Sequence, residues 1–199
     1  MSNRVREEGG GVANSLVLDE TIKKLRSNDQ IAYEELVDAY GERLLRLAYM
    51  VVGDQQLAED VVQESFLAVY TNVHNFRGDS SFDTWMTRIA LNKAKNKIRP
   101  KMWQKIMYFW DVQAEDTGPL PQQDYEEKEQ KRLVKDTMCA LPLKYRDVLY
   151  LYYYEEMKVK EIAQVLDVGE SGIKSRLQRG REKMKALLVT MGVGLDDEG

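Results

Sequence analysis

Polar and basic side chains recur along one face of the last strongly periodic segment, where they could bind DNA. They are Lys174, Ser175, Gln178, Arg181 and Lys185. A short amphipathic segment over 159–166 and a tight turn over 167–169 precede them. This order is typical of a helix-turn-helix, whose second helix contacts phosphates through Lys and Arg and base edges through Ser, Gln and Arg. The alternative is a helical hairpin with an ordinary charged surface, but the combined pattern favours DNA binding.

A second segment, 81–99, combines aromatic and basic residues in a way that suits single-stranded nucleic acid. Its apolar stripe contains Phe82, Trp85 and Ile89. Its outward face carries basic and amide groups: Arg88, Asn92, Lys95, Asn96 and Arg99. Unpaired bases stack on aromatic rings, and a flipped base can be read by polar groups in a loop pocket. We expect Phe82 in the core, whereas Trp85 fits either a core position or an exposed platform.

A third group of polar residues lies on one outward helical face, because Asp60, Gln63 and Glu64 stand at i, i+3 and i+4. An acidic face repels phosphate, and a protein partner that carries Arg or Lys fits it well. A metal site is conceivable, but the face lacks a further carboxylate or histidine at helical spacing. A plain solvated helix face is the remaining alternative.

The charge of the chain alternates in blocks, although its 29 basic and 33 acidic residues give a net charge of only −4. Residues 84–105 hold seven bases and no acid, and residues 111–129 hold seven acids against one lysine. Residues 170–185 hold six bases against two acids. Two basic blocks separated by an acidic stretch indicate two polyanion-facing surfaces, although solvated helix faces could also produce such blocks.

Several chemical functions are excluded by composition. The single cysteine, Cys139, permits no internal disulfide and no multi-cysteine zinc site, and the single histidine, His74, permits no HExxH motif. Walker A, GxGxxG and GxSxG motifs are absent from the sequence. We therefore expect no catalytic residues, no cofactor and no bound metal. The apolar runs are too short to span a bilayer and no secretory signal is visible, which predicts an intracellular protein.

The elements that position these groups are all predicted to be helices. Helical periodicity and turn residues divide the chain into two small helical domains and a flexible linker. The expected divisions are a disordered lead over 1–18, a first domain over 19–100, a linker over 101–124, a second domain over 125–191 and an acidic tail over 192–199.

Local stop and start signals give the expected helix ends. Asn28-Asp29 offers an N-cap, and Gly53 followed by Asp54 marks a stop and a fresh start. Ser80-x-x-Asp83 is a capping box in its broader form. Pro100 disfavours helix at the preceding residue, and Pro142 suits a first helical turn.

Ordered motifs give the chain a resemblance to a known family. Residues 60–66 fit D-x-x-Q-E-x-F, a segment of bacterial RNA polymerase sigma factors. Residues 75–92 resemble the stretch F-x-x-x-S-x-F-x-T-W-L-x-R-I-A-x-N of the extracytoplasmic-function (ECF) group of the sigma-70 family. The motifs Leu141-Pro142-x-x-x-Arg146-x-Val148, Glu161-Ile162-Ala163-x-x-Leu166 and 174–181 are similar to that group's C-terminal domain. The resemblance covers about residues 19–188.

This resemblance implies a sigma factor without catalytic activity, whose first domain is a sigma region 2 helical bundle and whose second is a sigma region 4 helix-turn-helix. It implies that Asp60, Gln63 and Glu64 contact core RNA polymerase. It assigns the melted −10 strand to Asn75, Phe76, Arg77, Asp79, Ser80, Trp85, Arg88, Asn92, Lys95 and Asn96. It assigns the −35 duplex to Ser171, Lys174, Ser175, Arg176, Gln178 and Arg179.

The implied partners are core RNA polymerase, promoter DNA as duplex and as melted strand, and an anti-sigma factor. The resemblance also implies a cytoplasmic protein that is monomeric in the holoenzyme and does not insert into a membrane. In one place the chain departs from the family. The usual P-V-G-T-V before the recognition helix is replaced here by residues 169–173, Gly-Glu-Ser-Gly-Ile, which puts the base preference and the helix cap in question.

Two other classes of protein fit parts of the pattern. A stand-alone helix-turn-helix regulator would bind a palindromic duplex as a dimer, but it leaves the aromatic, basic segment of the first domain unexplained. A metal-dependent nuclease would use Asp60 and Glu64, and substitution of both by alanine would then abolish activity. The sigma factor reading accounts for both basic blocks and for the acidic face.

Overall fold

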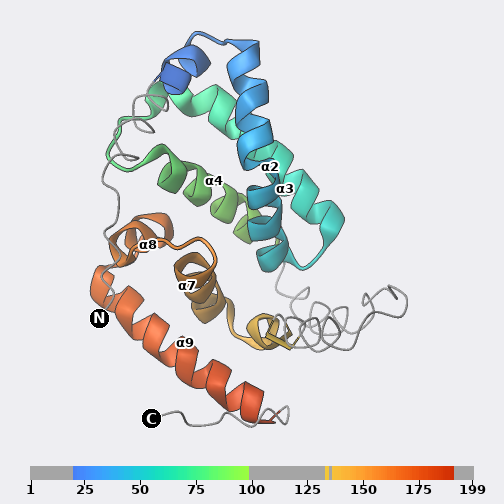
Figure 1. Ribbon diagram of the computed structural model, residues 1–199, viewed down its shortest axis with the longest axis vertical. Helices are drawn as coiled ribbons and strands as arrows, with labels where there is room; N and C mark the ends of the chain where they lie inside the picture. Colours follow the sequence, from blue (N-terminus) through green and yellow to red (C-terminus); the bar gives the residue numbers. More distant parts are fainter. Residues whose placement is uncertain (1–19, 99–132, 135, 191–199) are drawn as a thin grey trace, which may run out of the picture.

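The computed structural model describes residues 20–98, 133–134 and 136–190, and every regular element in these residues is a helix (Figure 1). This agrees with the predicted all-helical class. The expected lead over 1–18, the linker over 101–124 and the tail over 192–199 lie outside the described residues. The described N-terminal unit is residues 20–98, and the described C-terminal unit is residues 133–134 and 136–190.

The N-terminal unit begins with a helix over 20–26 and continues with α2 (Gln30–Val52), α3 (Gln55–Asn72), the 3₁₀ turn η1 (Val73–Asn75) and α4 (Phe82–Lys97). α2, α3 and α4 all pack against one another. Their shared core contains Leu44, Leu47, Val61, Phe82 and Leu91, each almost fully buried. Burial of these side chains is the main favourable term that holds the three helices together.

The predicted caps of α2 and α3 are confirmed. Asp29 accepts a hydrogen bond from the backbone N–H of Ala32, and Asp54 accepts one from Leu57. Gly53 ends α2 with φ +69°, a left-handed conformation that glycine adopts without the steric penalty of a side chain. These short-range bonds satisfy backbone groups that have no partner inside the helix.

The predicted capping box at the start of α4 is wrong by one residue. Ser81, and not Ser80, is the N-cap, and its hydroxyl accepts a hydrogen bond of 3.0 Å from the backbone N–H of Thr84. Asp83 points away from the cap, because its carboxylate binds Arg43 of α2. A long-range ion pair therefore takes the side chain that the sequence pattern assigned to a local bond.

The C-terminal unit contains α7 (Leu143–Tyr153), α8 (Val159–Leu166) and α9 (Glu170–Thr190), after helical residues at 133–134 and 136–140. α8 has the predicted bounds, and the turn after it uses Asp167 in the left-handed region, with φ +54°. α9 packs on both α7 and α8 and buries Ile173, Leu177 and Gly180. Cys139 is buried, as predicted.

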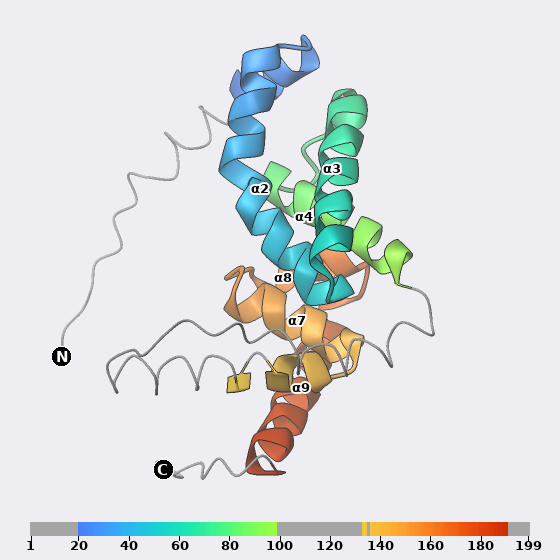
Figure 2. The same ribbon diagram turned by 90° about the vertical axis from the view of Figure 1, so that its right-hand side faces the viewer.

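The two units lie against each other along the long axis of the molecule (Figures 1 and 2). α8 packs on α4. The basic, aromatic helix of the N-terminal unit and the first helix of the predicted helix-turn-helix are therefore neighbours. Among the helices of the described residues, none is both long enough and apolar enough to cross a membrane.

Candidate nucleic-acid interface

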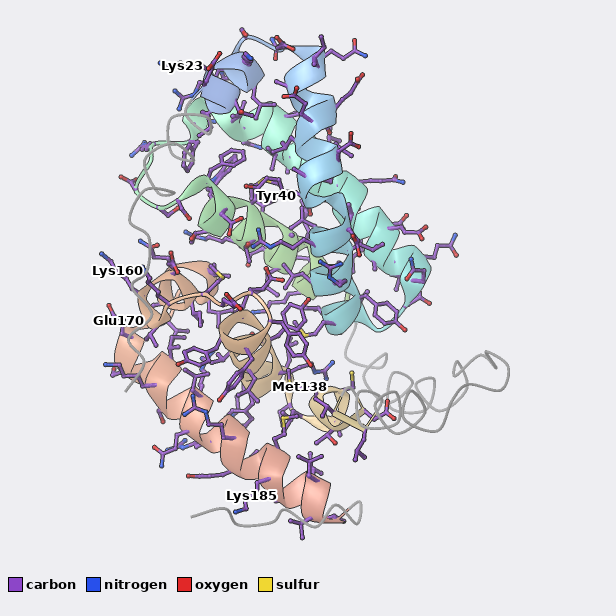
Figure 3. The ribbon with its side chains drawn as sticks, in the orientation of Figure 1. Lys23, Tyr40, Met138, Lys160, Glu170 and Lys185 are labelled. Atoms are coloured by element: carbon purple, nitrogen blue, oxygen red, sulfur yellow. The ribbon has the colours of Figure 1, made fainter. Side chains whose placement is uncertain are left out.

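α9 presents its polar side chains as a solvent-facing row. Its buried residues Ile173 and Leu177 anchor the opposite face, so the row is fixed by packing. Exposed residues on it include most of those predicted to contact the −35 duplex: Ser171, Lys174, Ser175, Gln178 and Arg179. Arg176 is half-buried. Glu170 and Lys185 mark the extent of this row along α9 in Figure 3.

The unusual start of α9 has a packing reason. The first backbone hydrogen bond of the helix runs from Ile173 N to the carbonyl oxygen of Gly169, which puts Gly169 at the N-cap position. A Cβ on Gly172 would lie 2.8 Å from Cγ1 of Val168, which is too close for a β-branched side chain to tolerate without moving. Gly172 therefore allows the turn to pack tightly against the first turn of α9.

The outward face of α4 carries the basic and amide residues that the sequence placed there. Arg88, Asn92 and Asn96 are exposed. Lys95 is different, because its Nζ lies 2.9 Å from Oδ2 of Asp147 in α7, a carboxylate whose side chain is only 2% exposed. The structure thus brings α4 to the C-terminal unit through one of the residues predicted to bind DNA.

The aromatic residues before and within α4 form one cluster. The Trp85 ring lies 5.2 Å from the Phe76 ring and 5.6 Å from the Phe82 ring, measured between centroids. Phe82 is buried, as predicted, whereas Trp85 and Phe76 are half-buried. Trp85 therefore packs on the core and keeps part of its surface open.

The loop that carries the other predicted −10 contacts is tied down from the N-terminal side. Arg26 donates hydrogen bonds to the carbonyl oxygens of Phe76, at 2.6 Å, and Val73, at 3.3 Å. Gly78 has φ +77°, which lets the chain turn back toward α4. Three of the contacts predicted for the loop are exposed, namely Asn75, Arg77 and Asp79. The fourth, Ser80, is half-buried.

The acidic face of α3 is present, but one of its three residues, Glu64, forms ion pairs with α4. Asp60 and Gln63 are exposed. Glu64 binds Lys97 at 2.6 Å and Lys93 at 3.6 Å, both from α4. The hydrogen bond from Lys97, together with the charges of both lysines, lowers the pKa of Glu64 below its ordinary value. The acidic face of α3 and the basic end of α4 therefore adjoin.

A groove lies between α2 and α3 beside this acidic face. Its volume is about 440 Å³, and its lining residues are mainly apolar and aromatic: Tyr33, Val37, Gly41, Leu45, Glu59, Val62, Gln63 and Phe66. Gln63 belongs to both the groove and the acidic face. The sequence analysis singled out no residue of α2 as a candidate contact, so the contribution of α2 to this groove was missed.

The contact between the two units is built from charged residues whose pairing the motifs did not indicate. Arg43 of α2 donates to Glu155, which follows α7, and also to Asp83 and Thr87 of α4. Burial alone would lower the pKa of Arg43, but Asp83 and Glu155 raise it above its ordinary value. Arg146 is 2% exposed and donates to the carbonyl oxygen of Met50 across the interface.

No cluster of three or more potential metal ligands occurs in the part of the chain that the structure describes. The side chains gathered here suit binding: cations for phosphate, aromatic rings for bases, and an acidic face with a groove for a protein.

Two family models match this chain. Sigma-70 region 2 matches residues 36–104, and Sigma-70, region 4 matches residues 131–184. The chain belongs to the sigma-70 family.

Curated relatives support the same identification. The ECF RNA polymerase sigma factor SigW of Bacillus subtilis is 31% identical over 87% of this chain and 97% of its own length. The RNA polymerase sigma-H factor of Pseudomonas aeruginosa is 34% identical over 84% of this chain and 91% of its own length. This sigma factor is therefore an ECF-type member of the family, similar to these relatives across both of its regions.

Solved structures share its fold. CnrH, in complex with the cytosolic domain of CnrY, superposes with a TM-score of 0.63 at 24% identity, covering 85% of this chain and 96% of that one. The sigma factor RpoE of Bartonella quintana, in complex with the anti-sigma factor NepR, gives 0.58 at 20% identity, covering 78% and 96%. As a sigma factor, the chain binds core RNA polymerase and directs promoter-specific initiation, with region 4 reading the −35 duplex and region 2 the melted −10 strand.

Proposed function

We propose that three surfaces divide the work of this sigma factor, with α9 on the −35 duplex, α4 with its preceding loop on the melted −10 strand, and α3 on core polymerase. The domains that carry them are residues 19–100 and 125–191. One observation carries this proposal. In the N-terminal unit, the aromatic cluster of Phe76, Phe82 and Trp85 adjoins the basic face of α4, and the C-terminal unit carries a second basic helix, α9.

The −35 surface is assigned to α9. Its proposed contacts are Ser171, Lys174, Ser175, Arg176, Gln178 and Arg179. The exposure of most of these residues supports the assignment, because a recognition helix must offer its first turns to the major groove. Lysine and arginine then neutralise phosphates, and serine and glutamine reach base edges.

The −10 surface is assigned to the loop and to α4. Its proposed contacts are Asn75, Phe76, Arg77, Asp79, Ser80, Trp85, Arg88, Asn92, Lys95 and Asn96. Support comes from the open part of Trp85 and from its backing by Phe76 and Phe82, since an aromatic platform must be rigid to capture an unstacked base. Strand opening would draw on this binding energy and needs no catalytic group.

The polymerase surface is assigned to Asp60, Gln63 and Glu64 of α3, together with the adjoining groove. A mixed apolar and acidic surface suits a protein partner that brings basic side chains and an apolar anchor. In one of the solved complexes, the sigma factor RpoE of Bartonella quintana is bound to the anti-sigma factor NepR. We extend that to this chain and propose an anti-sigma factor as a further partner, a cytoplasmic location, and a single copy in the holoenzyme.

The experiment that tests the proposal is run-off transcription with purified bacterial core RNA polymerase, with and without the chain, on a library of promoter fragments. Specific transcripts that require the chain are the expected result, and their start sites would define the promoter. Substitutions Asp60→Ala and Gln63→Ala should then reduce binding to core without altering the thermal unfolding of the free chain, because both side chains are exposed. Transcripts that are unaffected by both substitutions would refute the assignment of α3.

A further inference from the structure

A short helix at the start of the N-terminal unit ends beside the loop that the proposed function gives to the −10 strand. The helix covers residues 20–26, and Lys23 marks it in Figure 3. Ile22 and Leu25 are buried in the core of the unit, so packing fixes the position of the helix. The exposed side chain of Arg26 extends from the last residue of this helix to the loop.

Arg26 binds two backbone carbonyl groups at once. Its Nη2 donates to the carbonyl oxygen of Phe76 at 2.6 Å, and its Nε donates to the carbonyl oxygen of Val73 at 3.3 Å. The same oxygen of Val73 also accepts the backbone N–H of Phe76 at 3.2 Å. Both backbone polar groups of Phe76 are therefore held, the N–H by the turn η1 and the carbonyl by Arg26.

These carbonyl groups lie at the C-terminal end of a helical run, because η1 follows α3 without a break. The last carbonyl groups of such a run have no donor inside the helix, and together they carry a partial negative charge that a cation stabilises. The last turn of α3 and η1, which the structure describes in full, contain no lysine or arginine of their own. Arg26 supplies this cation from 47 residues earlier in the chain than Val73.

Holding the backbone of Phe76 also holds the ring that backs Trp85. The Phe76 ring lies 5.5 Å from the Phe82 ring, edge to face, and 5.2 Å from the Trp85 ring. Phe82 is fixed by burial in the core, whereas Phe76 begins the loop that turns at Gly78. A loop residue keeps its side chain in one place only where contacts fix its backbone. Arg26 provides such a contact.

We propose that Arg26 is a positioning residue for capture of the −10 strand, which holds Phe76 against Trp85 and so keeps the stacking platform in place. The inference rests on the proposed assignment of Trp85 to the melted strand. A platform that is ordered in advance loses less affinity to its own ordering when a base arrives. Without Arg26, the Phe76 ring would leave Trp85 part of the time, and capture of the base would first have to restore the contact.

A cation beside a DNA-binding loop could also act simply by attracting phosphate, and lysine separates the two roles. Lysine keeps the charge, so it would restore an electrostatic contact. Its single ammonium does not reproduce the planar fork with which arginine binds two oxygens in fixed geometry. Arg26→Lys should therefore behave like Arg26→Ala if Arg26 positions Phe76, and like the native chain if Arg26 only attracts phosphate.

The first measurement reads the surroundings of Trp85 in the free chain, without DNA. The chain contains three tryptophans, so the background Trp103→Phe plus Trp110→Phe leaves Trp85 as the only reporter. Quenching by acrylamide, which is neutral, measures how open its ring is. We expect Arg26→Ala and Arg26→Lys each to raise the quenching constant by about 1.5-fold or more, because the ring that backs Trp85 is released. The matched control, Lys23→Gln, removes the same charge from an exposed position of the same helix and should leave the constant unchanged.

The second measurement uses holoenzyme on a promoter fragment that the run-off library identifies, with the native tryptophans in place. Permanganate footprinting measures strand opening, and gel-shift assays at low temperature measure closed binding. Arg26→Ala and Arg26→Lys should each reduce strand opening roughly three- to tenfold, because a charge-assisted bond is lost while the stacking ring itself remains. Closed binding should stay close to the native value. All assays run well below the melting temperature of each variant, which circular dichroism provides, so that unfolded protein does not contribute.

An unchanged quenching constant in Arg26→Ala would overturn the inference, as would a raised constant with undiminished strand opening. Full rescue of strand opening by Arg26→Lys would show that Arg26 acts through its charge, and an equal loss of closed binding would show that it does not act on strand capture. Absence of transcripts from the native chain would instead refute the proposed function. The quenching experiment would then still decide whether Arg26 holds Phe76 against Trp85.

Discussion

α4 and α9 both carry a series of cations, yet the lysines of α4 lie in different surroundings from the cations of α9. Lys93, Lys95 and Lys97 of α4 each bind a carboxylate, either Glu64 of α3 or Asp147 of α7. Within the described residues, no ion pair joins Lys174, Arg176 or Arg179 of α9 to an acid. The two faces therefore start from different electrostatic states before any DNA arrives.

This difference predicts an order of events. Cations that are already exposed release only counterions when they meet phosphate, which favours binding and gives it a steep dependence on salt. Cations that hold internal carboxylates must first give up those bonds, so their net gain from DNA is smaller. We expect α9 to engage duplex more readily than α4 engages the melted strand, because Lys95 of α4 must first leave Asp147.

The largest expected effect concerns the aromatic platform of α4. Trp85→Ala should weaken capture of the melted −10 strand roughly 5- to 150-fold, because base stacking on an aromatic ring contributes ~1–3 kcal/mol. Binding of the holoenzyme to closed duplex should change little. Potassium permanganate footprinting measures strand opening, and gel-shift assays at low temperature measure closed binding. An equal loss in both assays would mean that Trp85, which packs on Phe76 and Phe82, acts only as a core residue.

The next effect compares cations on the two faces through salt dependence. Arg176→Ala and Arg179→Ala should each lower the slope of log affinity against log salt for the −35 duplex by about 1. Lys95→Ala should lower the slope for the −10 single strand by clearly less than the ~0.7 of one free phosphate contact, because Lys95 leaves Asp147 in order to bind. A decrease of the slope by the full ~0.7 in Lys95→Ala would show that Lys95 is as available to phosphate as the cations of α9. The proposed difference between α4 and α9 would then be wrong.

A smaller effect tests whether the first turn of α9 is held in place by packing. Gly172→Ala would push a Cβ to 2.8 Å from Val168 Cγ1, whereas Gly41→Ala in α2 meets no atom within 4 Å. Both changes gain helix propensity, so their difference isolates the clash. Gly172→Ala should be less stable than Gly41→Ala by roughly 1–3 kcal/mol in urea unfolding, and its −35 affinity should fall. Equal stability of the two variants would show that Val168 moves aside without cost.

Local features were predictable from the sequence because they depend on neighbouring residues. The caps at Asp29 and Asp54, the stop at Gly53 and the bounds of α8 all follow from side chains within a few positions of the helix end. The faces of α4 and α9 followed from helical periodicity in the same way. Periodicity identifies which side chains point outward, and that was sufficient to place most candidate contacts.

Long-range pairings were not predictable, since periodicity does not tell which opposite charge meets an outward residue. Arg43 and Glu155 are 112 residues apart, and Lys95 and Asp147 are 52 apart. The error at Ser80 has the same origin, because Asp83 could serve a local cap or the distant Arg43, and the ion pair prevailed. The groove between α2 and α3 also depends on how two helices approach each other, which a single sequence does not specify.

The smallest expected effect is a dependence of stability on pH at the other end of α4. Lys97 and Lys93 lower the pKa of Glu64 below its ordinary 4.5, so the folded state holds the proton less tightly than the unfolded chain. The pair therefore contributes stability above pH 4.5, and this contribution disappears as the pH falls through the lower pKa of the folded state. Glu64→Gln should be slightly less stable than the native chain in urea at pH 7, by no more than about 1 kcal/mol for an exposed pair.

As the pH falls below 4.5, the difference in urea midpoint between the two proteins should shrink, because the unfolded chain takes up the proton first and the native Glu64 follows at its lower pKa. Glu59→Gln is the matched control, since Glu59 is an exposed acid of the same helix whose hydrogen bond comes from the neutral Gln55. Its difference from the native chain at pH 7 should be small. A gap between native and Glu64→Gln proteins that persists undiminished at pH 3 would show that the carboxylate acts through packing, and that the lysines at this end of α4 are held no more firmly than those of α9.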